Sequence, residues 1–124
     1  EDALSLLVQS FGFKRGIPGD ADLVFDLRLL PNPHWSPSLR ALTGADAAVA
    51  RFLEEQEQTA ALFADIAGYV DRWLPAYAQS NRSYLTVALG CTGGRHRSVY
   101  MAERLHRHLA AAGQSVQLRH RDLP

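Results

Sequence analysis

The stretch Tyr84-Leu-Thr-Val-Ala-Leu-Gly90, continued by Cys91-Thr-Gly-Gly-Arg-His-Arg-Ser98, decides the fold. An apolar run typical of a buried strand enters a loop with two adjacent glycines. A helix is predicted over Ser98–Ala112, because Met101, Leu105 and Leu109 recur at a four-residue spacing. Gly113 supplies its C-cap, and a further strand follows over residues 115–121. Such a strand–helix–strand unit is right-handed and builds a parallel sheet.

The N-terminal half repeats the alternation of apolar runs and loops. Two strands are predicted, at Ala3–Ser10 and Ala21–Leu27, and a glycine-rich loop at Phe11–Gly19 separates them. The segment Leu29–Gly44 contains three prolines, which hold the backbone extended and exclude an α-helix. A segment of this kind is more often functional than accidental.

Two helices are predicted between this segment and the third strand. The first begins near Asp46, and the second has apolar residues at helical spacing from Leu62 to Tyr77. Pro75 should end or kink the second helix, because proline lacks the N–H that the helix needs. Together the elements predict a single three-layer α/β domain over residues 1–124, with a mainly parallel sheet.

Composition and charge bound the class of protein. The 124 residues are 47% hydrophobic, enough for one core, and include a single cysteine, which excludes an internal disulfide and suits the cytoplasm. No apolar run approaches the roughly 20 residues of a membrane span, and no signal peptide is visible. We therefore expect no membrane contact, no metal and no cofactor. The abrupt start at Glu1 is compatible with a trimmed domain.

Basic residues gather in the C-terminal part of a neutral chain. Residues 77–124 contain seven arginines and only two acids, Glu103 and Asp122. Within that field the glycine loop, Cys91–Ser98, brings backbone N–H groups, two arginines and two hydroxyls to a helix N-terminus, which is the composition of an anion site. The alternative is an ordinary glycine turn with solvated arginines, which the combined pattern disfavours.

Three other places carry candidate residues. Lys14 and Arg15 stand at the tip of the first loop, either solvated or reaching a ligand. Asp26 ends the second strand, where ligands bind in open parallel sheets, although a strand-end carboxylate is also compatible with a structural role. His34 and Trp35 offer a polar contact and a stacking platform, or else Trp35 covers the core and His34 is solvated.

The glycine loop also resembles the phosphate loop of cysteine-dependent phosphatases. Cys91, Gly94, Arg97 and Ser98 match the pattern C-x-x-G-x-x-R-S. In that reading Cys91 is the nucleophile, Arg97 holds the phosphate, and Asp26 is the one placed candidate for the general acid. Gly90 stands where that family usually has histidine, and a recognisable acid loop is absent from the sequence.

A second resemblance covers nearly the whole chain. The motifs that carry it occur in order and at compatible spacing: Ser10-Phe-Gly-Phe-Lys14, Asp26-Leu-Arg-Leu-Leu-Pro-Asn-Pro-His-Trp35, Asn81-Arg-Ser-Tyr-Leu-Thr-Val-Ala88, Gly90-Cys-Thr-Gly-Gly-Arg-His-Arg-Ser-Val-Tyr100 and Arg119-His-Arg121. They look like the C-terminal domain of the RapZ/YvcJ family. The family's N-terminal P-loop motif, G-x-x-x-x-G-K-[ST], is absent from these 124 residues, so we predict the C-terminal domain alone.

The resemblance implies a cytosolic bacterial domain with a fold akin to part of the phosphofructokinases. It implies a regulatory adaptor and metabolite sensor, which binds glucosamine-6-phosphate and small regulatory RNA and presents the RNA to a ribonuclease. The implied sugar-phosphate residues are Asp26, His34, Arg82, Cys91, Thr92, Gly93, Gly94, Arg95, His96, Arg97 and Ser98. The implied RNA-binding residues are Lys14, Arg95, His96, Arg97, Arg119, His120 and Arg121.

Two departures from the RNA-binding family member bear on the second of these functions. The sequence ends at Asp122-Leu-Pro124 where that member continues into a basic tail, and Gln114 stands where it has lysine. We therefore predict a retained sugar-phosphate pocket with a weaker RNA face. The enzyme alternative is the cysteine-dependent phosphatase, and the sequence leaves a homo-oligomer open.

Overall fold

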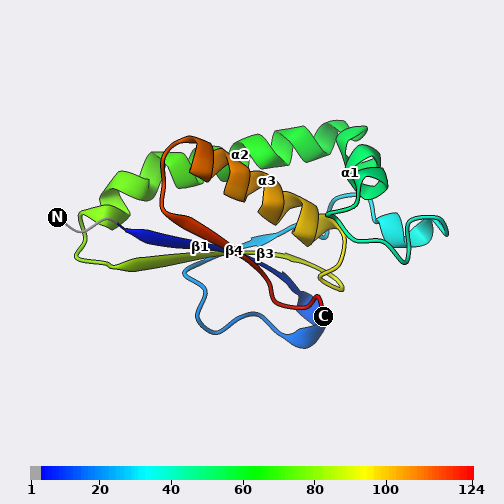
Figure 1. Ribbon diagram of the computed structural model, residues 1–124, viewed down its shortest axis with the longest axis horizontal. Coiled ribbons are helices and arrows are strands. Elements are labelled where there is room, and N and C mark those ends of the chain that lie inside the picture. The colour runs from blue at the N-terminus through cyan, green and yellow to red at the C-terminus, as the bar shows by residue number, and fades with distance from the viewer. Residues whose placement is uncertain (1–3) are drawn as a thin grey trace.

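The computed structural model describes residues 4–124, in which four strands form one parallel sheet in the order β2-β3-β1-β4 (Figure 1). The central strands β1 (Ser5–Gly12) and β3 (Tyr84–Cys91) pair along their whole length. The shorter strands β2 (Leu23–Asp26) and β4 (Val116–His120) form the two edges. The predicted single α/β domain with a mainly parallel sheet is confirmed.

The direction of each crossover explains where the helices lie. The connection from β2 to β3 carries α1 (Ala47–Glu54) and α2 (Glu57–Ala78), and the connection from β3 to β4 carries α3 (Arg97–Ala111). Both connections run the same way along the strand order, so right-handed crossovers place all three helices on one side of the sheet. The connection from β1 to β2 runs the other way, and it passes across the opposite side in Figure 1.

The main core lies between the sheet and the helices. Alternate residues of the central strands point into it, and the inward faces of α1, α2 and α3 close it. Its fully buried members include Val8, Val49, Leu53, Val87, Leu89, Leu105 and Leu109. None of the helices in residues 4–124 combines the length and the apolarity that a membrane span requires.

The other side of the sheet is covered mainly toward the carboxyl ends of its strands. Phe11 is fully buried there and meets Phe13 edge to face, with 4.8 Å between the ring centroids. Phe13 belongs to the short 3-10 helix η1 (Phe13–Arg15), and the Arg28 guanidinium lies 3.8 Å above its ring. This packing fixes η1 beside the end of β1, where the candidate site begins.

The element boundaries differ from the predictions in instructive ways. The first strand runs to Gly12 rather than Ser10, and predicted Ala3 lies outside the described residues. Of the two expectations for Pro75, that it ends or kinks α2, the first is wrong, because the helix continues to Ala78. Pro75 is exposed near the last turn, so water can satisfy the carbonyl that loses its partner. Gly113 has a φ of 86°, and Gln114 N–H donates to Leu109 O, as expected for a helix C-cap.

Candidate functional site

The glycine loop sits where the carboxyl ends of the central strands meet. Gly12 and Cys91 are direct partners in the β1–β3 pair, so the chain leaving β3 turns next to the end of β1. Gly94 has a φ of 76°, and a Cβ added there would lie 2.6 Å from the backbone nitrogen of Gly12. A Cβ at Gly12 would in turn lie 2.5 Å from the carbonyl carbon of Gly93. The loop therefore rests on β1 through backbone alone.

One cavity, here called the anion cavity, opens at this edge of the sheet and measures about 310 Å³. The glycine loop and the segment between β2 and α1 form its walls, and η1 contributes one residue. The lining residues are Lys14, Asn32, His34, Trp35, Cys91, Thr92, Gly93, Arg95, His96 and Arg97. Three of them are cationic, and this set contains no carboxylate, so the cavity favours an anion.

Cys91 and Ser98 form the floor of the loop. The buried Cys91 thiol donates to Ser98 Oγ over 3.1 Å, and the Ser98 N–H lies 3.4 Å from the sulfur. Ser98 is fully buried at the start of α3, so its hydroxyl serves the thiol rather than the cavity. Cys91 is therefore placed as a wall of the anion cavity.

Arg97 holds two loops together from inside the protein. Its side chain is only 4% exposed, and Nη1 donates to the carbonyls of Arg28, over 3.0 Å, and Leu30, over 2.9 Å. Nη2 reaches Thr92 Oγ1 over 3.4 Å, while Nε is buried without a partner. Because one nitrogen is committed to carbonyls, Arg97 cannot fork an anion with its full guanidinium.

His96 and Arg95 fasten the loop to the segment before α1. The buried His96 ring contacts Leu39 O through Nε2 over 3.1 Å, and burial lowers its pKa although the Leu39 carbonyl acts in the opposite direction. Arg95 Nη2 donates to Ala41 O over 3.2 Å. His96 is thus held neutral and structural, whereas Arg95 remains partly exposed on the cavity wall.

Asp26 stands beside the anion cavity but outside its lining. Both carboxylate oxygens accept from the half-exposed Arg28 side chain, at 2.9 and 2.7 Å. The side-chain hydrogen bond from Arg28 lowers the pKa of Asp26, and the charge of Arg97 acts in the same direction. Asp26 is therefore ionised, which suits an anchor and not the general acid of a phosphatase.

The structure does not bring Arg82 to the anion cavity. Arg82 precedes the amino end of β3, where Nη1 pairs with Asp22 over 2.8 Å. It lines a different cavity, together with Tyr69, Trp73 and Tyr77 of α2. Within one chain, Arg82 therefore lies at the opposite end of β3 from the anion cavity.

A second depression, here called the basic cavity, shares Lys14, Gly93 and Arg95 with the first. It has a volume of about 310 Å³, and its remaining lining residues are Arg15, Arg121, Asp122, Leu123 and Pro124. Four cations line it, and Asp122, the one acid, is already paired with Arg121. The two cavities together make a continuous cationic edge at the carboxyl ends of the strands.

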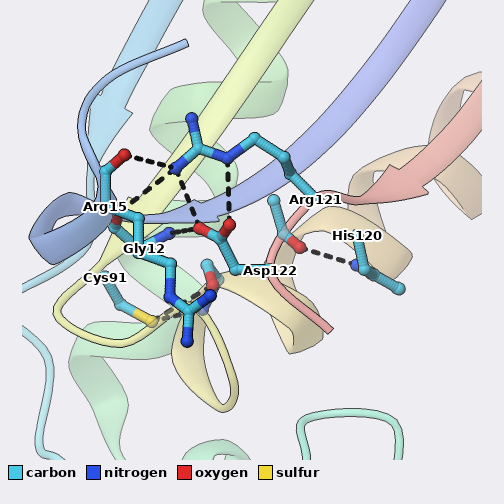
Figure 2. A network of polar contacts seen from close by, with 8 residues as sticks. Gly12, Arg15, Cys91, His120, Arg121 and Asp122 are labelled. Carbon is cyan, nitrogen blue, oxygen red and sulfur yellow. Dashed lines mark hydrogen bonds and ion pairs between the residues drawn. The ribbon is translucent and has the colours of Figure 1, made fainter. Parts of the chain in front are cut away.

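Figure 2 shows how the residues after β4 close this edge. Asp122 accepts from Gly12 N–H over 2.7 Å and from Arg121 Nη2 over 2.9 Å. The Arg121 guanidinium also donates to Arg15 O over 3.3 Å. Burial would raise the pKa of Asp122, but the hydrogen bonds from Arg121 and Gly12 outweigh it and lower the pKa. Arg121 is therefore largely occupied in holding η1.

The other two residues of the predicted RNA set have different surroundings. His120 accepts from or donates to Ser10 Oγ at 2.7 Å through Nδ1, and its Nε2 lies 3.2 Å from Glu103 Oε2. The arrangement resembles a serine–histidine–acid triad, but Ser10 is fully buried and no substrate reaches it. Arg119 is exposed on β4 and lines neither cavity.

The geometry suits binding better than phosphoryl transfer. The loop arginine serves backbone carbonyls, and the candidate acid is held ionised by its arginine partner. Among residues 4–124, no three histidine, cysteine or acidic side chains come together in a metal-binding arrangement. What remains available is a set of cations, backbone N–H groups and a helix N-terminus around one cavity.

A family model described as the RapZ C-terminal domain matches residues 4–124. The chain belongs to the RapZ C-terminal domain family. The family predicted from the sequence motifs is thus confirmed. The match covers every described element, from β1 to β4.

Curated relatives of this RapZ C-terminal domain share its sequence along nearly all of its length. Proteins named "Nucleotide-binding protein" from Halorhodospira halophila, Cellvibrio japonicus and Pseudomonas fluorescens are 62%, 58% and 57% identical, respectively. The aligned regions cover 97 to 99% of this chain and 41 to 43% of each relative. The chain therefore spans about two fifths of the curated relatives that it matches.

Sequence reasoning on the loop missed two residues that shape the site. Gly12 ends β1 and receives the backbone of the glycine loop, and Asp122 binds its N–H. The signal for Gly12 was its place between Phe11 and Phe13, directly after a buried strand. Asp122 had no comparable signal, because its partner lies 110 residues earlier in the chain.

Proposed function

We propose that this domain binds a phosphorylated small molecule in the anion cavity and acts as a cytosolic regulatory adaptor. The observation that carries the proposal is the convergence of Lys14, Arg95 and Arg97 with the glycine loop around about 310 Å³, without a lining carboxylate. Backbone N–H groups at a helix N-terminus add a favourable field for an anion. The volume lies at the lower end of ordinary small-ligand sites, which suits a monosaccharide phosphate.

An amino-sugar phosphate such as glucosamine-6-phosphate is the proposed ligand class. The resemblance of the motifs to the family supports it, and Asp26 supplies a carboxylate beside the cavity. In the structure that carboxylate is neutralised by Arg28 in a half-exposed pair. A ligand ammonium could replace Arg28 there at little electrostatic cost, since exposed ion pairs are weak.

Thermal shift with a panel of phosphates tests the proposal. Glucosamine-6-phosphate, glucose-6-phosphate and inorganic phosphate are compared on wild type, Lys14→Ala and Arg95→Ala. A ligand at one hundred times its Kd should stabilise wild type by about 2.7 kcal/mol. Both variants should lose most of that gain, whereas Arg107→Ala, an exposed arginine far along α3, should retain it. The absence of stabilisation by any phosphorylated ligand would refute the proposal.

Binding of small RNA is the second proposed function, supported by the basic cavity that continues the anion cavity. Arg15 extends the shared cations Lys14 and Arg95 along the edge of the sheet, whereas Arg121 lines the same cavity but is paired with Asp122. A phosphate backbone bound there should show a steep salt dependence. Presentation of that RNA to a ribonuclease is the corresponding adaptor role.

The shared wall leads us to propose competition between the two ligands. RNA affinity should fall when glucosamine-6-phosphate saturates the anion cavity, because both ligands need Lys14 and Arg95. Arg15→Ala should weaken RNA binding and leave the sugar phosphate unaffected, since Arg15 lines only the basic cavity. Unchanged RNA affinity at saturating sugar phosphate would argue against competition.

A further inference from the structure

Trp35 stands exposed at the mouth of the anion cavity. It belongs to the 3-10 helix η2 (Pro33–Trp35), and 76% of its surface is accessible although it lines the cavity. The alternative role of covering the core is thus excluded. The indole is large and mainly apolar, and its exposed face is free to contact a ligand. A ligand that covers this face gains binding free energy from the apolar area that is buried.

The backbone around Trp35 is held firmly, so its position at the rim is fixed by the fold. Pro33 is buried at the start of η2, and Asn32 Oδ1 accepts from His34 N–H over 3.0 Å. Arg40 Nε donates to His34 O over 3.0 Å. The indole meets the His34 ring edge to face, with 5.5 Å between centroids. A platform held in this way loses little further freedom when a ligand binds.

The rest of the cavity recognises charge but offers no other flat apolar surface. Its lining consists of cations, imidazoles, an amide, a thiol, a hydroxyl and a glycine, apart from Trp35. A phosphate group is served by the glycine loop with Lys14 and Arg95. The remainder of the ligand then faces η2, where Trp35 presents the indole.

We propose that Trp35 is a specificity-determining residue, which selects a phosphate ester that carries a ring by packing its indole against the face of that ring. The inference rests on the proposed function and adds the class of ligand: cyclic rather than open-chain. A pyranose and a nucleobase both present such a face, so the experiment includes both. Binding of inorganic phosphate, which has no ring, measures the contribution of the charged group alone.

Calorimetric titration of wild type, Trp35→Phe and Trp35→Ala provides the test. The ligands are glucose-6-phosphate, open-chain sorbitol-6-phosphate, adenosine 5′-monophosphate and inorganic phosphate, none of which carries an ammonium group that could pair with Asp26. Wild type should bind a cyclic ligand about ten-fold more tightly than the open-chain one, the size expected of one stacking contact. Trp35→Ala should abolish that preference and leave the Kd of inorganic phosphate unchanged, whereas Trp35→Phe should keep most of it.

A matched control comes from the second tryptophan. Trp73 is also exposed but lies on α2 and lines the cavity beside Arg82. Trp73→Phe should keep the wild-type ring preference, and it leaves Trp35 as the single indole, whose fluorescence should change when a cyclic ligand binds. The relative effect on the sugar and the nucleotide shows which kind of ring is preferred.

Two results would overturn the proposal, and they are distinguishable. If inorganic phosphate binds but Trp35→Ala keeps the preference for cyclic ligands, Trp35 does not select the ring and the proposed function stands. If no phosphate binds to wild type, the proposed function and this inference both fail. Because Trp35 is exposed, an unchanged melting temperature without ligand should accompany each variant and exclude a folding defect.

Discussion

At the residue scale, Arg97 has the charge expected of a phosphate-binding residue, but its guanidinium donates mainly to backbone carbonyls of the protein itself. The loop pattern suggests a phosphate fork, yet Nη1 binds the carbonyls of Arg28 and Leu30. That role depends on the path of a segment almost 70 residues away, and loop spacing contains no information about it. The sequence therefore located the arginine correctly and left its partners undetermined.

Replacement of Arg97 should destabilise the domain strongly. Arg97→Met leaves two carbonyls without their donor beside a buried side chain, for which we expect a loss of about 3 kcal/mol in the free energy of unfolding. Urea denaturation measures it. Arg107→Met, at an exposed position of the same helix, should change stability by less than about 0.5 kcal/mol. Equal stabilities of the two variants would contradict the role of Arg97 in holding the two loops together.

His96 should make stability depend on pH in the mildly acidic range. Burial lowers its folded-state pKa below the usual 6.5, so the unfolded chain binds the proton more readily. The contribution of the neutral ring is fully present above the unfolded pKa and is lost as pH falls below about 6.5. Urea midpoints at pH 7.5, 6.5 and 5.5 should fall more steeply for wild type than for His96→Gln. The other histidines are present in both wild type and His96→Gln. Urea midpoints that fall in parallel with pH would therefore show that the pH dependence does not arise from His96.

At the scale of elements, the glycine loop depends on a backbone-to-backbone contact. Gly94 needs its positive φ and the close approach to Gly12, whereas a Cβ at Gly93 meets nothing within 4 Å. Gly94→Ala should therefore lose about 2 kcal/mol or more of stability. Gly93→Ala should fold normally but weaken phosphate binding, since its methyl group narrows the approach to the loop. Thermal melts and phosphate titrations separate the two effects.

The elements themselves were largely predictable, and the exceptions have physical causes. Buried strands and amphipathic helices leave periodic patterns, so β3, α3 and β4 were located within one or two residues. Pro75 does not end α2, because the cost of a proline depends on how near the helix end lies and on whether water reaches the freed carbonyl. The role of Gly12 was not predicted, because a Cβ at this position would clash only when β1 and β3 are paired.

At the scale of the molecule, the residues after β4 return to the end of β1 and secure η1. Asp122, with a side chain 7% exposed, joins Gly12 to Arg121. Asp122→Asn should therefore cost about 2 kcal/mol at pH 7. Its folded pKa is depressed, so this contribution is present above the usual carboxyl value of 3.8 and disappears as pH falls through the folded pKa.

Urea denaturation of wild type and Asp122→Asn at pH 7 and pH 3 checks this prediction. The difference between the two chains should shrink at the lower pH. Asp65→Asn, an exposed carboxylate on α2, should show no such difference at either pH. If the difference in the free energy of unfolding between wild type and Asp122→Asn stayed constant with pH, Asp122 would act through its shape rather than its charge.

The assembly of the site from distant segments marks the limit of sequence reasoning at this scale. The rule that ligands bind at the carboxyl ends of parallel strands correctly joined Asp26 and the glycine loop at one edge. Arg82, which the resemblance implied as a sugar-phosphate residue, lies instead just before the amino end of β3. The strand order, which brings η1 and Arg121 to the same edge, was not contained in the local patterns.

The carbonyls that hold Arg97 also bear on how this family tolerates sequence change. Any amino acid supplies a carbonyl oxygen, so the side chains at positions 28 and 30 are free of this particular constraint. In a saturation mutagenesis experiment, Arg97 should be intolerant, whereas tolerance at positions 28 and 30 should follow other contacts: the buried Leu30 side chain in the core and the pair of Arg28 with Asp26. The path of this backbone segment would remain under selection, although no side chain at positions 28 and 30 records its contact with Arg97.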